Sequence, residues 1–349
     1  MTSSSQESRT AGRIAPSPAT RGAATQHADA FVAAHDDAAR SLGTALADVL
    51  DEPDTFVEML TAGLRGLADP AYAAEQERVA PGGAQVIGVR WPLVRAIASQ
   101  LRVPLRQSSS STAVSLAQRL AVEPIREVRL FSHVPLARSL RDDPERSWQV
   151  MRRLARAATD WICVDDLAQL TARGVLEEPF RWAELEQLVY SEYRFERRLV
   201  GATLAAIPHE VPSRVRPRLR TGPALELVAA QIGDADPYVQ KALSWALRSW
   251  APIDAELVTR FLRDQADRAA ATDDGNRAWV VRDALPALTE ETSAPIRRTV
   301  AGIRRTATAP DTSSAFETAA RFRAGAGLGV LADQAVAHQG ERMQRQGVA

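Results

Sequence analysis

The chain has 349 residues, of which 45% are hydrophobic, 25% charged and only 5% aromatic, and its formal net charge is zero. Strand-forming residues are sparse, and no run of about 18 apolar residues occurs, which argues against a sheet protein and excludes a membrane-spanning helix. The single cysteine, Cys163, excludes an internal disulfide and fits a reducing cytoplasm, where we expect the protein to work.

The chain divides into two tails and one helical region. Residues 1–27, rich in Ser, Thr, Ala and Arg, are predicted to be a disordered tail. Helical periodicity runs over 28–306, although 68–88 is irregular, and residues 307–349 are predicted to be a low-complexity tail. The periodicity predicts helices at 28–50, 53–68, 91–104, 111–121, 123–140, 143–158, 160–173, 179–191, 193–207, 222–232, 236–250, 253–268, 275–288 and 293–306.

Helix starts and weak internal similarity indicate a repeat array. Asp143-Pro144 and Asp236-Pro237 each combine an acceptor side chain with a proline suited to the first helical turn. The segment that begins at Arg194 resembles the segment that begins at Pro237, 43 residues later. A period in the forties is typical of paired helices, which stack because one pair cannot bury its apolar face alone. We therefore predict an all-α, right-handed solenoid of HEAT-like repeats with a concave face.

The zero net charge conceals an uneven distribution of charges. Residues 28–79 carry eleven acidic side chains against three arginines. By contrast, residues 194–220 carry seven arginines against two glutamates, and 295–306 carry four arginines and no acid. This placement favours an anionic partner for the later part of the chain more than the total charge does.

The predicted helix 236–250 has an unusual second face. At 100° per residue, Tyr238, Lys241, Trp245 and Arg248 lie opposite the apolar stripe. An aromatic pair flanked by two cations and turned away from the core is unusual for a purely structural helix, which makes this face a candidate binding surface. The alternative is that the aromatic residues cover a groove between repeats while the cations are solvated.

In the predicted helix 160–173, Trp161 and Asp165 are four residues apart, so one lies above the other on a face otherwise occupied by alanine. The alternative is a structural role, in which Asp165 caps a neighbouring helix and Trp161 is half-buried. Cys163 lies on the buried side of this helix and is expected to be a core residue.

The predicted helix 193–207 places Arg194, Arg198, Gly201 and Ala205 on one side, away from its apolar stripe. Small residues beside arginine would let a polyanion approach the backbone closely, which favours phosphate contact. The alternative is a solvated arginine face with small residues by chance.

Three segments carry a resemblance to a known family: residues 160–165 (DWICVD), 195–198 (FERR) and 238–248 (YVQKALSWALR). In their order and rough separation they resemble the AlkD-type DNA alkylation repair proteins, which are HEAT-like-repeat DNA glycosylases. The resemblance covers about residues 125–265. It implies excision of cationic alkylpurines such as 3-methyladenine and 7-methylguanine from double-stranded DNA, without a base-flipping pocket.

The resemblance also implies roles for individual residues. Asp165 would be the catalytic carboxylate, and Trp161 and Trp245 would be aromatic walls against the deoxyribose of the lesion. Arg198 would contact a backbone phosphate near the lesion, and Arg248 would help to hold the DNA. With the face analysis, the candidate DNA-binding residues are Arg194, Tyr238, Lys241 and Arg248.

One carboxylate is chemically sufficient for this reaction. A purine alkylated on a ring nitrogen is already cationic, so it leaves as a neutral base without being protonated. The sugar then gains oxocarbenium character, which a carboxylate and tryptophan faces stabilise. We expect no cofactor and no metal, because the five histidines lack metal-site spacing. We also expect a monomer.

Two other functions remain open from the sequence. The chain could be a non-catalytic relative that binds DNA, which the neutral net charge favours and the retained Asp165 disfavours. It could also be a HEAT-repeat scaffold that binds proteins through its groove. A scaffold would show no steep salt dependence of DNA affinity, whereas a phosphate-binding protein would.

Overall fold

The computed structural model describes residues 18–323, which form helices joined by loops, with no β-strand within this range. This confirms the all-helical fold predicted from the sequence. In chain order the elements are α1 (Pro18–Ala47), α2 (Pro53–Gly66), α3 (Pro70–Val79), α4 (Trp91–Gln107), α5 (Ser110–Ala121), α6 (Arg126–Leu130), α7 (His133–Asp142), α8 (Pro144–Ala157), α9 (Trp161–Glu177), α10 (Arg181–Leu188), α11 (Arg194–Glu210), the 3₁₀ helix η1 (Arg216–Arg218), α12 (Thr221–Gln231), α13 (Pro237–Trp250), α14 (Ala255–Thr272), α15 (Gly275–Ala284), the 3₁₀ helix η2 (Leu285–Ala287), α16 (Glu290–Thr299) and α17 (Ser314–Arg323).

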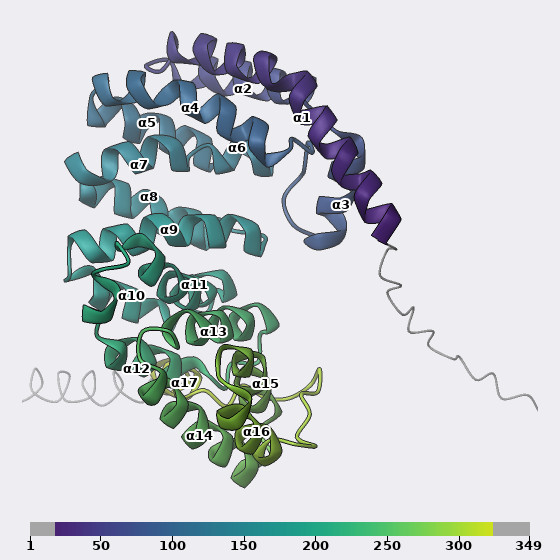
Figure 1. The fold of residues 1–349 in the computed structure, drawn as a ribbon. Coiled ribbons are helices and arrows are strands. Elements are labelled where there is room, and N and C mark those ends of the chain that lie inside the picture. Colours follow the sequence, from purple (N-terminus) through teal and green to yellow (C-terminus); the bar gives the residue numbers. More distant parts are fainter. Residues whose placement is uncertain (1–17, 324–349) are drawn as a thin grey trace, which may run out of the picture.

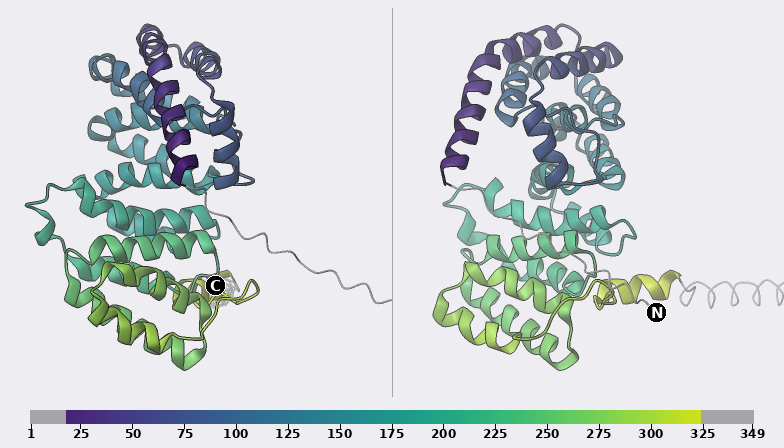
Figure 2. Two further views of the ribbon diagram at one scale, coloured as in Figure 1. Left: turned by 45° about the vertical axis from the view of Figure 1, so that its right-hand side comes forward. Right: turned by 90° about the vertical axis from the view of Figure 1, so that its right-hand side faces the viewer.

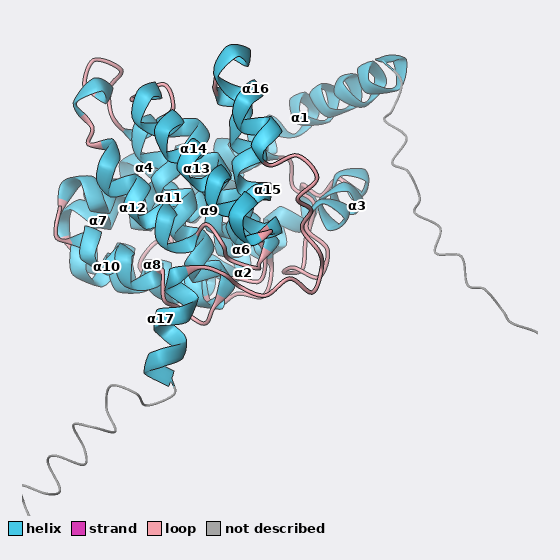
Figure 3. Ribbon diagram, turned by 90° about the horizontal axis from the view of Figure 1, so that it is seen from below, coloured by secondary structure: helices cyan, strands magenta, loops and turns pink. Residues whose placement is uncertain are grey.

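The helices stack in a curved array (Figure 1). One layer is a continuous series in which α1 packs on α4, α4 on α7, α7 on α9, α9 on α11, α11 on α13 and α13 on α15. Helices α5, α8, α12 and α14 pack behind this series. Figure 3, which views the molecule from below, shows the elements superposed along the stack. This arrangement brings residues from successive repeats onto one wall.

The packed interior consists of two clusters of buried apolar side chains. One lies beneath the helices from α1 to α7, and the larger one extends from α5 to α17. Cys163 is buried in α9, which confirms its predicted place in the core, and burial raises the pKa of its thiol to about 12. No helix among residues 18–323 has the length and apolar character needed to cross a membrane.

The ends of the array differ from the predicted boundaries. Helix α1 begins at Pro18 rather than near residue 28, and α17 lies within the range 307–349 that was predicted to be a tail. Helix α17 packs against α12, and Thr312 before it donates its backbone N–H to the carbonyl oxygen of Gly233. The remaining parts of both predicted tails, 1–17 and 324–349, lie outside the described residues.

Two interior predictions also differ from the structure. The single helix predicted over 123–140 is broken into α6 and α7, and Pro135 lies in the first turn of α7, where its missing N–H has no cost. Helix α3 lies within residues 68–88, where the sequence shows no regular helical periodicity. Its N-cap is Asp69, whose side chain accepts the N–H groups of Ala71 and Tyr72, and Pro70 follows at the first position.

Candidate functional site

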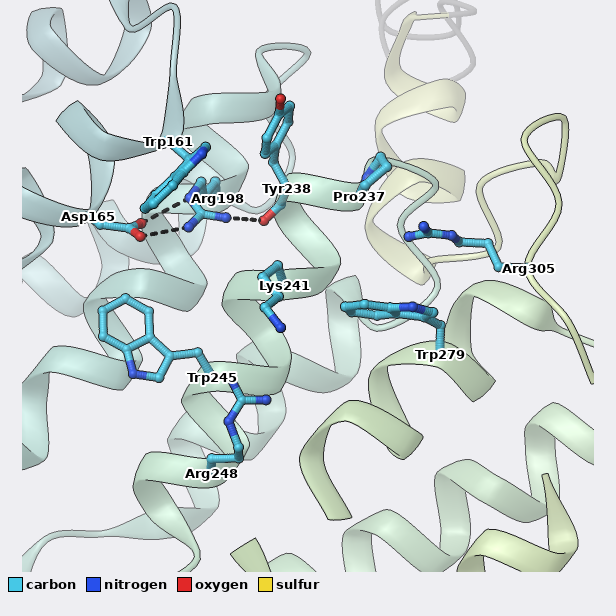
Figure 4. Close-up of a pocket in the computed structure, with 10 residues that line it drawn as sticks. All are labelled: Trp161, Asp165, Arg198, Pro237, Tyr238, Lys241, Trp245, Arg248, Trp279 and Arg305. Atoms are coloured by element: carbon cyan, nitrogen blue, oxygen red, sulfur yellow. Dashed lines mark hydrogen bonds and ion pairs between the residues drawn. The ribbon is translucent and has the colours of Figure 1, made fainter. Parts of the chain in front are cut away.

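A cavity of about 500 Å³ lies between α9, α11, α13 and α15 (Figure 4). It brings together most of the side chains that the sequence singled out from three separate segments. The residues that line it are Trp161, Asp165, Arg198, Pro237, Tyr238, Lys241, Trp245, Arg248, Trp279 and Arg305. The stacking of the repeats therefore converts three faces on successive helices into one site.

The start of α9 is fixed by a buried aspartate. Asp160 caps the helix by accepting the backbone N–H groups of Ile162 and Cys163 at 3.1 and 3.2 Å. The same carboxylate accepts the Arg126 Nε–H at 2.9 Å. Capping fixes the first turn of the helix, so Trp161 at the first helical position and Asp165 one turn later share a defined direction.

Asp165 is the carboxylate at the wall of the cavity, and Arg198 of α11 holds it in a bidentate pair. The Arg198 Nε donates to Oδ1 at 2.9 Å and Nη2 donates to Oδ2 at 2.7 Å. The third nitrogen, Nη1, donates to the backbone oxygen of Tyr238 on α13 at 2.5 Å. A planar guanidinium bonded in this way fixes both the position and the orientation of the carboxylate.

The two partners are not equally accessible. The Asp165 side chain is 21% exposed, whereas that of Arg198 is 4% exposed. Burial raises the pKa of Asp165 above its ordinary value of 3.8, and the neighbouring carboxylates Asp160 and Asp166 raise it further, while Arg198 acts in the opposite direction. Asp165 is therefore the member of the pair that a ligand in the cavity can reach.

Trp161 and Trp245 lie on either side of Asp165 (Figure 4). Both indoles are half-buried, and both pack against the main apolar cluster. The Arg198 guanidinium carbon lies 5.7 Å from the centre of the Trp161 ring, so that indole also helps to cover the ion pair. The arrangement places the Asp165 carboxylate between two indole side chains at the cavity wall.

Helix α13 supplies the opposite side of the cavity. As predicted from the Asp-Pro pair, Asp236 caps this helix by accepting the Tyr238 N–H at 2.8 Å, with Pro237 at the first position. Tyr238 contributes its backbone oxygen to Arg198, and its half-buried ring lies 5.7 Å from the ring of the buried Phe195. Arg194 is 52% exposed and lies over the Tyr238 ring at 5.4 Å, at the edge of the site.

The two other predicted cations are paired with a carboxylate that the sequence analysis did not identify. Asp283 of α15 accepts the Lys241 Nζ at 3.1 Å and the Arg248 Nη1 at 2.6 Å. It also accepts the Ser244 hydroxyl at 2.6 Å. Burial tends to raise the pKa of Asp283, but these three donors together lower it below its ordinary value. Lys241 and Arg248 therefore share a single carboxylate, which compensates one of their two positive charges.

The predicted bare face of α11 is not bare. Gly201 and Ala205 are both buried. A Cβ on Gly201 would lie 2.8 Å from the backbone carbonyl carbon of Ala242, so the missing side chain lets α13 approach closely. The interpretation of these small residues as a path for a polyanion was wrong, because a neighbouring helix occupies that path. Of the four residues of this helix that were predicted to face away from the core, only Arg194 is exposed to solvent.

Two further residues of the site, besides Asp283, were missed from the sequence. Trp279 of α15 lies close to two cations. The Lys241 Nζ is 5.7 Å and the Arg305 guanidinium carbon 5.1 Å from its ring centre. Arg305, in the segment after α16, donates to Gln240 Oε1 at 2.6 Å. Arg305 belongs to the basic cluster 295–306 that the sequence analysis noted. Nothing in the sequence indicates, however, that its side chain lines this cavity.

No group of three or more His, Cys, Asp or Glu side chains suited to a metal ion occurs in the part of the chain that the structure describes. His338, one of the five histidines, lies outside that part.

Comparison with known proteins gives a family for this fold and site. A family model described as DNA alkylation repair enzyme matches residues 60–286. A solved structure from Enterococcus faecalis, described as a predicted DNA alkylation repair enzyme, is 14% identical and has a TM-score of 0.48. That match covers 56% of this chain and 89% of the other. A search of curated proteins found no match.

Proposed function

The chain belongs to the DNA alkylation repair enzyme family, and from that premise we propose that it is a DNA glycosylase for cationic alkylpurines. The proposed reaction is hydrolysis of the N-glycosidic bond of lesions such as 3-methyladenine and 7-methylguanine in duplex DNA. The observation that carries the proposal is the position of Asp165, a reachable carboxylate held by Arg198 between Trp161 and Trp245.

The chemistry needs the site to stabilise positive charge on a sugar. When the cationic base departs as a neutral molecule, the bonding electrons leave with it and the deoxyribose becomes oxocarbenium-like. The Asp165 carboxylate stabilises that charge and orients a water molecule, whose oxygen forms the new bond to the sugar carbon and whose proton passes to the carboxylate or to solvent. The indole faces of Trp161 and Trp245 add cation–π stabilisation.

Arg198 has a positioning role in this proposal. Its guanidinium is buried and its three nitrogens already donate to Asp165 and to the Tyr238 backbone, so it is badly placed to reach a phosphate. By fixing the carboxylate before substrate binds, it removes the cost of reorganising the site during the reaction. It also keeps Asp165 more readily ionised than burial alone would.

The reaction does not require the lesion to leave the base stack. The carboxylate has to reach the sugar rather than the base, and the leaving base needs no general acid. The proposal therefore predicts strong selection for charged lesions, since a neutral base would depart as an unstabilised anion. At the rim, the exposed Arg194 and the half-buried Tyr238 would contact the strand beside the lesion.

The test is release of bases from duplexes that carry one defined lesion each. The wild-type protein should release 7-methylguanine from methylated duplex DNA, and it should release hypoxanthine, an uncharged lesion base, from a matched duplex far more slowly. Salt-sensitive DNA binding without release of any alkylpurine would instead support a non-catalytic DNA-binding relative. Absence of both release and salt-dependent binding would support a protein-binding scaffold.

A further inference from the structure

The connection between α11 and α12 has a concentration of positive charge that the proposed reaction does not use. Residues 211–220, here called the arginine loop, include η1 and project from one side of the array (Figure 2). Arginine occurs at every second position from 214 to the end of the loop, at Arg214, Arg216, Arg218 and Arg220.

These charges are not balanced within the protein. No ion pair joins any of the four loop arginines to a carboxylate in the range 18–323. The acid next to the loop, Glu210, is already bonded to Arg173 of α9 at 2.6 Å. The cations of the neighbouring candidate site differ in this respect, since Lys241 and Arg248 share Asp283. The loop is therefore a local source of uncompensated positive charge.

A second cavity, of about 480 Å³, lies between this loop, the end of α11 and the second half of α13. It shares Trp245 and Arg248 with the candidate site, so the two cavities meet at the Trp245 indole. Its other polar side chains are His209, Ser213, Arg216 and Ser249, and none of the described residues that line it is acidic.

The polar side chains of this second cavity, which is otherwise lined by apolar residues, suit an anion. Arg216 lines the cavity, and its buried Nε has no hydrogen-bond partner in the described structure, so the guanidinium has unused donor capacity. Arg248 already donates to Asp283, which leaves Arg216 as the main uncompensated charge at the cavity. Hydroxyl groups from Ser213 and Ser249 and the imidazole of His209 add further donors. Guanidinium and hydroxyl groups are the usual partners of backbone phosphates.

We propose that the second cavity and the arginine loop bind phosphates of the DNA strand next to the lesion nucleotide. This inference rests on the proposed function, because it assumes that the damaged sugar stands at Asp165. A strand in that position passes Trp245 and enters the second cavity with its neighbouring backbone. Arg216 holds one phosphate inside the cavity, and the exposed Arg214, Arg218 and Arg220 hold phosphates outside it. The loop supplies the phosphate contacts that the buried Arg198 does not make.

The inference is tested by the salt dependence of duplex binding, measured by fluorescence anisotropy on undamaged DNA. Affinity for B-DNA falls as salt rises, and each lost phosphate contact reduces the magnitude of the slope of log affinity against log salt by about 0.9. The double variant Arg216→Ala/Arg218→Ala should therefore lose about 1.8 from the wild-type slope. The matched control, Arg263→Ala/Arg268→Ala, removes two exposed arginines from α14 and should keep the wild-type slope.

Two further variants protect the test from a folding defect. Arg216→Lys keeps the charge and should keep most of the slope. If thermal melting shows that Arg216→Ala unfolds the protein, Arg218→Ala/Arg220→Ala changes two exposed side chains only and has the same expected loss of about 1.8. A wild-type slope in well-folded loop variants overturns the inference.

Measuring base release in parallel separates this inference from the proposed function. Loss of slope in the loop variants together with no alkylpurine release by wild type would support the phosphate site and contradict the glycosylase. Release by wild type together with an unchanged slope in the loop variants would do the reverse.

Discussion

Replacing Arg198 with methionine removes the guanidinium that holds Asp165 while it preserves much of the side-chain volume. Arg198 is 4% exposed and Asp165 is 21% exposed, so the pair is mostly buried. Removing one partner from a buried ion pair costs about 3–5 kcal/mol in the free energy of unfolding. Because Asp165 keeps partial access to water, we expect the lower end, about 3 kcal/mol at neutral pH.

The loss in free energy of unfolding should depend on pH, and the direction of that dependence follows from the direction in which the Asp165 pKa is shifted. Burial raises this pKa above 3.8 and Arg198 opposes the rise, so the pKa is higher still in the variant. The folded variant then binds a proton more tightly than the unfolded chain does. Its free energy of unfolding therefore falls as the pH rises from the ordinary value through the raised one. The destabilisation should be smallest in acid and largest at neutral pH.

Urea unfolding at pH 5 and pH 7.5 measures this effect, with Asp165→Asn and the double variant completing a thermodynamic cycle. The double variant should lose less free energy of unfolding than the sum of the losses in the two single variants, because it leaves no unpaired buried charge. The salt slope of DNA binding should stay at the wild-type value. A small, pH-independent cost together with a slope lowered by about 1 would refute the positioning role and assign Arg198 to a phosphate.

Three further changes test other parts of the site. Trp161→Ala should slow 7-methylguanine release by about 30-fold, the equivalent of the roughly 2 kcal/mol of a desolvated cation–π contact, in single-turnover assays with unchanged circular dichroism. Gly201→Ala should lower the free energy of unfolding by about 1–3 kcal/mol, measured in urea, because the new Cβ meets the Ala242 backbone at 2.8 Å; an unchanged stability would show that the α11–α13 contact is loose. The rate of release by wild type, corrected for spontaneous depurination, should fall in acid with a midpoint above pH 3.8, because burial raises the pKa of Asp165; a midpoint below that value would contradict the described environment.

Features encoded within one helix were predictable from the sequence. The cap at Asp236 and the shared direction of Trp161 and Asp165 follow from spacing along a single segment, and both are present in the structure. Helix α3 could have been found in the same way, because Asp69-Pro70 repeats the Asp-Pro start that was recognised elsewhere.

Features that depend on a neighbouring helix were not predictable. Helical periodicity shows that Gly201 and Ala205 share a face, but not that α13 covers it. It shows that Lys241 and Arg248 share a face, but not that both pair with Asp283 from the next repeat. One helical period cannot fix the rotation and closeness of the next helix, since side-chain size at the contact determines both.

The most direct test of the account is release of 7-methylguanine from methylated duplex DNA by wild type and by Asp165→Asn. Asparagine keeps the shape of the side chain and removes its charge, so DNA affinity should be retained while release slows by about 10²- to 10³-fold, as when an electrostatic stabiliser is lost from other active sites. Equal rates of release by the two proteins would contradict the central claim that the Asp165 carboxylate stabilises the developing positive charge.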